Sequence, residues 1–324
     1  MGRARDQRQD QHHPQAVEAL TLDGLPLSLT EADVDRLLTP ADAIAAVEDS
    51  FVRLQAGTIE NVPRYRVALE GGFLAVMSAV DGERGLACVK TYSAGADGLR
   101  FVVVLFERGE LRALIEADRL GQLRTGSASA VAAKHLAKPA ARTLGVIGCG
   151  LQARSQVACI REALPGIEET IAYCRTAERL AAFCEEMDAE AAESHRDAAA
   201  ADVVVTITTS RDPVLRGEWL QPGALVCAAG ANHPKARELD NAVLERAAFV
   251  CCDSLADARI ESGDLIEPVG QGVLDWLEVH ELQEVVAGEL PGRQADDDIV
   301  LFKSNGLAAW DLAVAARVAE LAGS

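Results

Sequence analysis

The chain is poor in aromatic residues, in lysine and in positive charge as a whole. Only 4% of its 324 residues are aromatic, and 31 lysines and arginines stand against 50 aspartates and glutamates, so the formal net charge is −19. Such an acidic surface repels phosphate groups, which argues against a nucleic acid or an anionic membrane as the partner. No apolar stretch approaches the roughly 20 residues of a membrane-spanning helix, so none is predicted.

Disulfide and metal-binding patterns are missing too. The eight cysteines show no C-x-x-C spacing, and Cys251 and Cys252 are neighbours, which is poor geometry for an ordinary disulfide. We interpret them as buried thiols in a reducing compartment, which predicts a cytoplasmic protein. His12 and His13 lack further ligands, so no metal site is predicted. The polar N-terminal segment has no apolar core of a secretory signal, and residues 1–22 are expected to be a disordered tail.

The length and the 49% of apolar residues suffice for two domains. In the first part, threonines at 30 and 39 mark the starts of two helices within 28–57. Strand-like runs joined by glycine turns and one helix rich in small residues then follow. The strands are expected at 64–69, 73–78, 87–92, 101–106 and 111–116, and the helix at 123–136.

From residue 141 strands and helices alternate, which predicts a parallel sheet with helical crossovers. A late strand at 299–303 precedes a helix at 306–321 that is apolar on all sides and is therefore expected to be buried, packing back on the first domain. The other strands are expected near 143–148, 169–174, 202–207, 224–230 and 248–253, and the other helices near 151–163, 177–187 and 240–247.

A glycine motif lies at the first of these strand-to-helix junctions. Gly148 allows a tight turn, Gly150 lets the backbone approach a pyrophosphate, and Ala153 is small enough for close packing of helix on strand. The helix that begins at Leu151 offers free N–H groups and its positive dipole end to phosphates. The motif with its flanking elements predicts a dinucleotide site rather than a plain strand–helix turn.

The end of the second strand bears on the choice of cofactor. NAD sites usually carry an acidic residue there for the ribose hydroxyls, but this chain has Cys174. Arg175 and Thr176 follow and could bind a 2′-phosphate. We therefore predict that NADP(H) is preferred, with NAD(H) possible; the alternative is that Arg175 is an ordinary surface residue.

Three cations in the first part occupy unusual places. Lys90 ends an apolar run and shares a strand face with Cys88, Arg124 starts a helix of small residues, and Arg64 follows a proline at a strand start. Buried cations need an anion, and a substrate carboxylate is one candidate. Ordinary structural ion pairs are the alternative for each residue taken singly.

Several longer motifs resemble the ornithine cyclodeaminase/mu-crystallin family over roughly residues 25–322. The resemblance rests on Leu123-Arg124-Thr125, on Gly145-x-x-Gly148-x-Gly150-x-Gln152-Ala153, on Thr206-x-Thr208-Thr209, on Ala228-Ala229-Gly230-Ala231-Asn232 with Glu238-Leu239-Asp240, and on Leu301-Phe302-Lys303-Ser304-x-Gly306 with Asp311. It implies an α/β protein: a Rossmann-type doubly wound parallel sheet at 141–305 and an α+β substrate-binding and dimerisation domain at 23–140 plus 306–324. A homodimer is therefore expected.

The resemblance also implies roles for particular residues. Arg64, Lys90 and Arg124 resemble the family's substrate-carboxylate clamp, with Arg66 as the rival of Arg64. Ornithine cyclodeaminases carry an aspartate where this chain has Asn232, which cannot act as a carboxylate base; His233 is a possible replacement. The expected cofactor contacts are Thr125, Gly148, Gly150, Leu151, Gln152, Ala153, Cys174, Arg175, Thr176, Thr206, Thr208, Gly230 and Asn305.

These features together predict an oxidoreductase that transfers hydride between NADP(H) and a small amino or imino acid. The cations would hold the carboxylate, and Lys90 or a water would protonate the imine. A cyclic ketimine is the first choice of substrate, an alanine-dehydrogenase-like reaction is the second and ornithine cyclodeamination is the third. The alternative from another class is a protein that binds NADPH without turnover.

Overall fold

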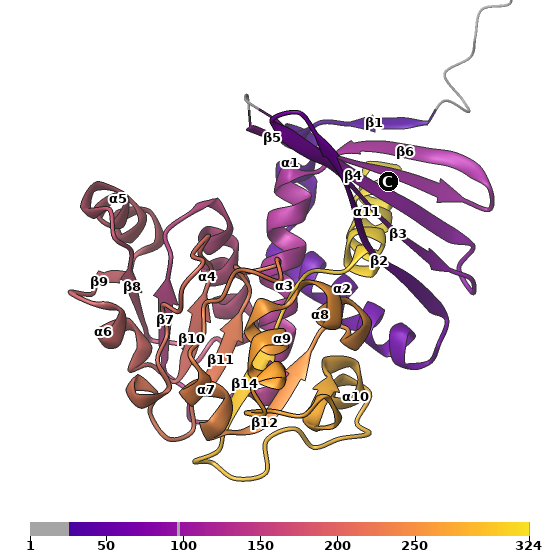
Figure 1. Ribbon diagram of the computed structural model, residues 1–324. Coiled ribbons are helices and arrows are strands. Elements are labelled where there is room, and N and C mark those ends of the chain that lie inside the picture. Colours follow the sequence, from indigo (N-terminus) through magenta and orange to yellow (C-terminus); the bar gives the residue numbers. More distant parts are fainter. Residues whose placement is uncertain (1–25, 96–97, 324) are drawn as a thin grey trace, which may run out of the picture.

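The computed structural model describes residues 26–95 and 98–323, which form two sheets with helices packed around them (Figure 1). The expected tail at 1–22 lies outside the described residues. No helix in the described part of the chain is long and apolar enough to cross a membrane.

The first sheet has six strands in the order β1-β6-β5-β4-β3-β2, antiparallel except that β1 runs parallel to β6. The five predicted strands are confirmed and are mostly longer than expected, while β1 is too short to have a readable pattern. The two early helices are also confirmed, and Thr30 and Thr39 cap them as predicted. The elements are β1 Leu27–Leu29, α1 Glu31–Leu37, α2 Pro40–Gln55, β2 Ile59–Leu69, β3 Gly72–Asp81, β4 Leu86–Gly95, β5 Gly98–Glu107 and β6 Glu110–Glu116.

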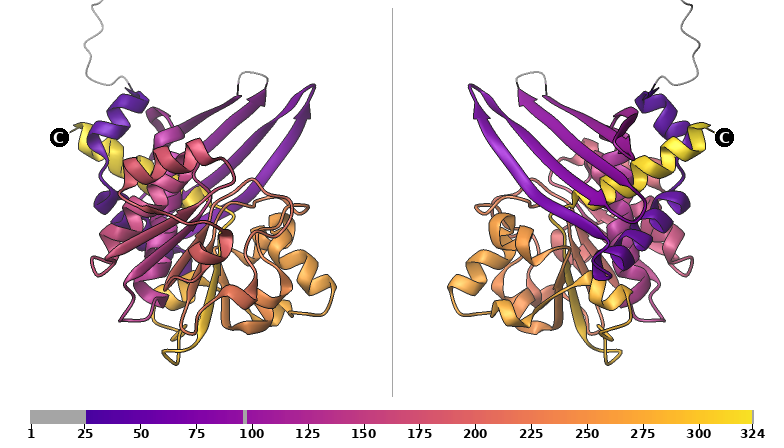
Figure 2. Two further views of the ribbon diagram at one scale, coloured as in Figure 1. Left: turned by 90° about the vertical axis from the view of Figure 1, so that its left-hand side faces the viewer. Right: turned by 90° about the vertical axis from the view of Figure 1, so that its right-hand side faces the viewer.

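Two buried helices cover one face of this sheet. α3 spans Asp118–Leu136, and α11 spans Ala308–Gly323, so the C-terminal helix returns to the first sheet as predicted. In the right-hand view of Figure 2, α11 runs across the sheet. α3 also packs tightly on α4 (Leu151–Ala163), because a Cβ on Gly126 would lie only 2.3 Å from Ser155 O.

The second sheet has eight parallel strands in the order β13-β12-β14-β11-β10-β7-β8-β9. All predicted strands and helices of this part are present, and the short elements β9, β13, α6, α8, α9 and α10 were not predicted. The strands are β7 Thr143–Ile147, β8 Glu169–Tyr173, β9 Glu190–Ala191, β10 Val203–Thr206, β11 Leu225–Ala228, β12 Ala247–Cys252, β13 Val279–Glu281 and β14 Ile299–Lys303. Besides α4, the helices are α5 Ala177–Met187, α6 His195–Ala199, α7 Asn241–Arg246, α8 Leu255–Glu261, α9 Gly263–Gly270 and α10 Leu282–Val286, with two 3-10 turns at Gly217–Trp219 and Trp276–Glu278.

The strand order reverses at β7, which lies between β8 and β10. In a doubly wound sheet, the carboxyl ends of the strands at such a switch point form the crevice that binds ligands. Here this edge carries the Gly148–Gly150 turn after β7 and the loops after β10 and β11. The predicted fold class, a Rossmann-type parallel sheet plus a second α+β unit, is confirmed.

Candidate active site

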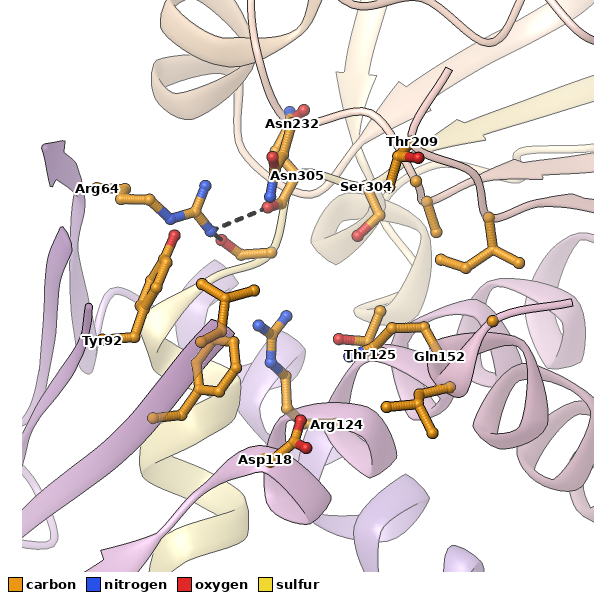
Figure 3. A pocket seen from close by; sticks show the side chains of 18 of the residues that line it. Arg64, Tyr92, Asp118, Arg124, Thr125, Gln152, Thr209, Asn232, Ser304 and Asn305 are labelled. Carbon is orange, nitrogen blue, oxygen red and sulfur yellow. Dashed lines mark hydrogen bonds between the residues drawn. The ribbon is translucent and has the colours of Figure 1, made fainter. Parts of the chain in front are cut away.

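A cavity of about 480 Å³ opens between the two sheets, with walls from both (Figure 3). One wall comes from β2–β5 and α3, and the other comes from the loops after β7, β10, β11 and β14. Its lining includes Arg64, Arg66, Phe73, Met77, Lys90, Tyr92, Phe101, Asp118, Arg124, Thr125, Gly150, Leu151, Gln152, Thr208, Thr209, Gly230, Asn232, Asn305 and Gly306. The structure therefore brings the predicted cations and the glycine turn to one cavity.

The glycine turn has the geometry that a dinucleotide needs. Gly148 has a φ of 114°, and its N–H donates to Tyr173 O at 2.9 Å. Gly150 precedes α4, and a Cβ built on it would meet nothing within 4 Å. Open space and a helix N-terminus therefore lie together where a pyrophosphate would bind. Ala153 is fully buried behind the turn and does not line the cavity.

A second cavity of about 250 Å³ lies at the ends of β7 and β8, on the other side of the turn. Cys174, Arg175 and Thr176 line it, and their predicted contact with the adenosine ribose stays a prediction. Arg179 and His195 also line it and were not predicted, although Arg179 lies one helical turn after Arg175. No carboxylate is among the described residues that line this cavity. Burial, and then the charge of Arg175, lower the pKa of His195.

The threonines after β10 have different surroundings. The hydroxyl of Thr206 is buried and donates to Glu238 Oε2 at 3.1 Å, so this residue lines neither cavity. Thr208 lines both, and its N–H and hydroxyl donate to Glu238 Oε1 at 2.7 and 2.8 Å. Glu238 also accepts the N–H of Gly230 at 2.8 Å. Its buried carboxylate, whose pKa is raised by burial, therefore holds together two loops that line the first cavity. The cofactor contact expected of Thr206 stays a prediction.

Two of the cations share one buried carboxylate. Lys90 Nζ lies 2.8 Å from Asp311 Oδ1, and Arg124 Nε lies 3.3 Å from the same oxygen. Burial, and then the charge of Arg124, lower the pKa of Lys90 to about 8, although Asp311 opposes the shift. Asp311 does not line the cavity. The positive groups of Lys90 and Arg124 therefore face the cavity, and the single negative charge of Asp311 lies behind them.

Two arginines of β2 form a similar arrangement. Arg64 and Arg66 both pair with Glu261 of α8, with Arg66 Nη1 at 2.6 Å from Oε1. Arg64 Nη2 also donates to the backbone oxygen of Asn305 at 3.2 Å (Figure 3). Arg64 is the more deeply buried of the two, but both line the cavity. Either or both could therefore be the β2 arginine of the predicted carboxylate clamp.

Two amide side chains at the cavity, those of Asn305 and Gln152, have polar atoms without a hydrogen-bond partner among the described residues. Both side-chain polar atoms of Asn305 are buried without a hydrogen bond among the described residues, and so is Gln152 Oε1. Buried polar groups are normally paired, so these atoms point to a ligand. Asn232 also lines the cavity, whereas His233 is exposed, lies outside the lining and accepts the N–H of Lys235 at 3.1 Å.

Of the predicted site residues, Ala153, Thr206 and His233, the possible replacement base, line neither cavity. The sequence analysis missed an aromatic wall and one acid: Phe73, Tyr92, Phe101 and Asp118. Tyr92 could have been found, because it is two residues after Lys90 on the same strand face. The described residues contain no cluster of potential metal ligands.

Fold and site together are those of a dinucleotide-dependent oxidoreductase. The chain belongs to the ornithine cyclodeaminase/mu-crystallin family, whose sequence model matches residues 26–324. It is 35% identical to an alanine dehydrogenase of Archaeoglobus fulgidus over 306 residues, which cover 91% of this chain and 94% of the relative. The resemblance inferred from the motifs is therefore confirmed.

Two solved structures have the same fold. One is a Delta(1)-pyrroline-2-carboxylate reductase of Thermococcus litoralis in complex with NADH and L-proline, with a TM-score of 0.86, 30% identity and coverage of 91% of this chain and 97% of the other. The second is an archaeal alanine dehydrogenase dimer with bound NAD, with a TM-score of 0.86, 32% identity and coverage of 92% and 96%.

Proposed function

We propose that this protein reduces a small cyclic 2-imino acid to the amino acid, with NADPH as the preferred reductant. At the coarser level, the chain is an NAD(P)-dependent oxidoreductase acting on CH–NH or CH–NH₂ groups, an imine reductase or an alanine dehydrogenase. One observation carries the finer proposal: Lys90 and Arg124 line the same cavity as Gly150 and Gln152.

The residues of the crevice suit a nicotinamide dinucleotide. Gly150 leaves room for the pyrophosphate, and the unpaired amide atoms of Gln152 and Asn305 offer hydrogen bonds inside the cavity. When bound, the reduced cofactor supplies a hydride. The protein's own part is to orient the substrate carbon and to provide charge and a proton.

The cations bind the substrate carboxylate. Lys90 and Arg124 share the single charge of Asp311, so this group has a net positive charge that a substrate carboxylate neutralises. The pKa of Lys90, about 8, keeps its ammonium protonated at neutral pH but close to release. A donor with a pKa near the working pH is efficient, so Lys90 protonates the imine nitrogen.

The apolar wall suits a ring. Beside the cations, Tyr92 meets Phe73 edge to face, with ring centroids 5.9 Å apart, and meets Phe101 in a tilted arrangement, with ring centroids 5.0 Å apart. A saturated five- or six-membered ring fits such a wall better than a charged side chain does. An alanine-dehydrogenase-like reaction is the second choice, supported by the Archaeoglobus relative. Ornithine cyclodeamination is third, because Asn232 offers no carboxylate base.

The preference for NADPH rests on the second cavity. Arg175 and Arg179 line it with His195 and without an acid among the described lining residues. An arginine there accommodates a 2′-phosphate, whereas an acid would repel it. The two solved relatives contain NADH and NAD. The proposed preference for NADPH therefore rests on this chain's own residues and not on those relatives.

We also propose a homodimer through the uncovered face of the six-stranded sheet. This face exposes apolar side chains that α3 and α11 do not cover: Val62, Tyr65, Val67, Leu69, Leu74, Val80, Val102 and Leu114. Tyr65 is 70% exposed, which is costly for a large ring unless a partner covers it. The dimeric alanine dehydrogenase supports this state, and replacing Tyr65 and Val67 by glutamate should give monomers in light scattering. All eight cysteines are free, which supports the cytoplasm as compartment.

Steady-state kinetics with Δ1-pyrroline-2-carboxylate, Δ1-piperideine-2-carboxylate and pyruvate plus ammonia test the proposal, each with NADPH and NADH. The expected result is the highest kcat/KM for a cyclic imine with NADPH. In Arg175→Ala, kcat/KM should fall with NADPH and stay unchanged with NADH. Preferred amination of pyruvate would favour the second choice, and NADPH binding without turnover would favour a pure binding role.

A further inference from the structure

Asp118 is the acid that the proposed mechanism has not used. It is the first residue of α3 and lines the cavity, where every other charged lining residue is a cation: Arg64, Arg66, Lys90 and Arg124. In Figure 3 its carboxylate lies near the base of Arg124, on the side of the cavity opposite Asn232.

The carboxylate of Asp118 has no ion pair and no hydrogen bond among the described residues. Acids at a helix start often cap the helix, but here Glu31 of α1 performs that function. Its two carboxylate oxygens accept the N–H groups of Asp118 and Arg119 at 2.7 and 2.8 Å. The Asp118 side chain is therefore left to the cavity.

The charges around the cavity explain why a free acid is useful. Glu261 and Asp311 each neutralise one of two cations, so four positive groups face the cavity against two negative charges behind it. A substrate carboxylate removes one of the two remaining positive charges. The proton that Lys90 gives to the imine moves a positive charge onto the substrate nitrogen without changing the total, and an iminium beside the remaining arginines is unstable unless an anion faces it. Asn232 lines the cavity but is neutral.

We propose that Asp118 is a catalytic residue that pairs with the cationic nitrogen of the substrate, the protonated imine before reduction, and with the ammonium form of the product once the neutral amine has taken up a proton from water. This inference rests on the proposed function. In the step, Lys90 Nζ gives its proton to the imine nitrogen, the carbon of the C=N bond accepts the hydride, and the π electron pair becomes the nitrogen lone pair. Asp118 stabilises the positive charge while it is on the nitrogen and does not itself transfer a proton.

Ligand binding isolates this contact from turnover. L-Proline has a cationic ring nitrogen, and L-tetrahydrofuran-2-carboxylate has a neutral ether oxygen at the same place. Dissociation constants of both are measured by calorimetry with the oxidised cofactor at saturation. In Asp118→Asn, which has the same shape, proline should bind about tenfold or more weakly, and the ether should change less than twofold. Asp118→Glu keeps the charge and should recover part of the proline affinity.

Asp35→Asn is the matched control. Asp35 also lies near the start of α3, where its carboxylate pairs with Arg119 at 2.8 Å, but it does not line the cavity. This variant should leave both dissociation constants unchanged. In kinetics, Asp118→Asn should lower kcat/KM for the cyclic imine about tenfold to hundredfold.

The results separate this inference from the proposed function. The role of Asp118 is overturned if Asp118→Asn weakens the binding of both ligands equally, or if it leaves the binding of both unchanged. Wild-type protein that distinguishes the ligands as expected but reduces no imine supports the contact and overturns the reductase. Wild-type protein that binds neither ligand overturns both.

Discussion

Lys90 Nζ lies 2.8 Å from Asp311 Oδ1, and the two residues are 221 positions apart in the chain. The pair joins β4 to α11, and both side chains are buried. Because Arg124 approaches the same carboxylate oxygen, Asp311 only partly offsets the cost of burying the ammonium. A lysine with a pKa near the physiological range follows from this arrangement.

The reduction is expected to fall at alkaline pH. The pKa of Lys90 is lowered from 10.5 to about 8, so its proton is present below pH 8 and is lost above it. kcat/KM for imine reduction should therefore decrease tenfold per pH unit above about 8, while amine oxidation, which needs the neutral amine of Lys90, should increase through the same range. Lys90→Arg keeps the charge and removes the inflection. A flat profile to pH 10 in the wild type would contradict the role of Lys90.

Asp311→Asn should cost stability and move this inflection. The substitution leaves Lys90 and Arg124 buried without their shared anion, at a cost of about 3–5 kcal/mol in the free energy of unfolding. The pKa of Lys90 should fall further, so the decline in reduction begins below pH 8. The control is Asp42→Asn, which breaks the surface pair with Arg317 at 2.8 Å and should cost at most about 1 kcal/mol. Denaturant unfolding and pH profiles measure both effects.

Much of the fold could be predicted because the hydrophobic period of a helix or strand, and the residues that begin and end it, lie close together in the sequence. The alternation around Lys90 placed it on the inner face of its strand, and the all-round apolar pattern of the last helix predicted its burial. The short elements β1, β9 and β13 could not be predicted, since two or three residues show no period. Their strand state depends on neighbours such as β6, β8 and β12.

The site was predictable only in part for a related reason. Cations in apolar surroundings and the glycine turn are visible in the sequence, but their partners are not. Glu261 comes from α8, about 200 positions after Arg64, and no local pattern links them. Phe73 and Phe101 look like core residues in a strand, and only the cavity shows that they form its wall. In the sequence, Asp118 looks like an ordinary acid that caps the start of a helix. The structure shows that Glu31 caps this helix instead.

Asp257 should make the protein less stable at alkaline pH. It is 1% exposed, and burial, followed by the charge of Asp253, raises its pKa to about 7. A raised folded pKa means that the stabilising contribution of the protonated acid is complete below pH 3.8 and is lost as the pH rises through 7. Asp257→Asn should therefore raise the Tm more at pH 8 than at pH 5. The corresponding difference in the free energy of unfolding should be at most about 4 kcal/mol. Equal shifts at the two pH values would contradict this cause.

Alanine at the two glycines of the turn should have opposite consequences. At Gly148, with a φ of 114°, a Cβ would lie 2.4 Å from Ile207 O, so Gly148→Ala should lower the Tm because the turn itself is strained. At Gly150 the backbone is extended, and a Cβ would meet nothing within 4 Å, so Gly150→Ala should keep the wild-type Tm. Its methyl group would nevertheless occupy the space into which the pyrophosphate fits, and NADPH affinity should fall at least about tenfold. Thermal unfolding without ligand and fluorescence titration with NADPH measure the two effects. A Gly150→Ala variant with unchanged NADPH affinity would mean that the dinucleotide does not bind at this turn.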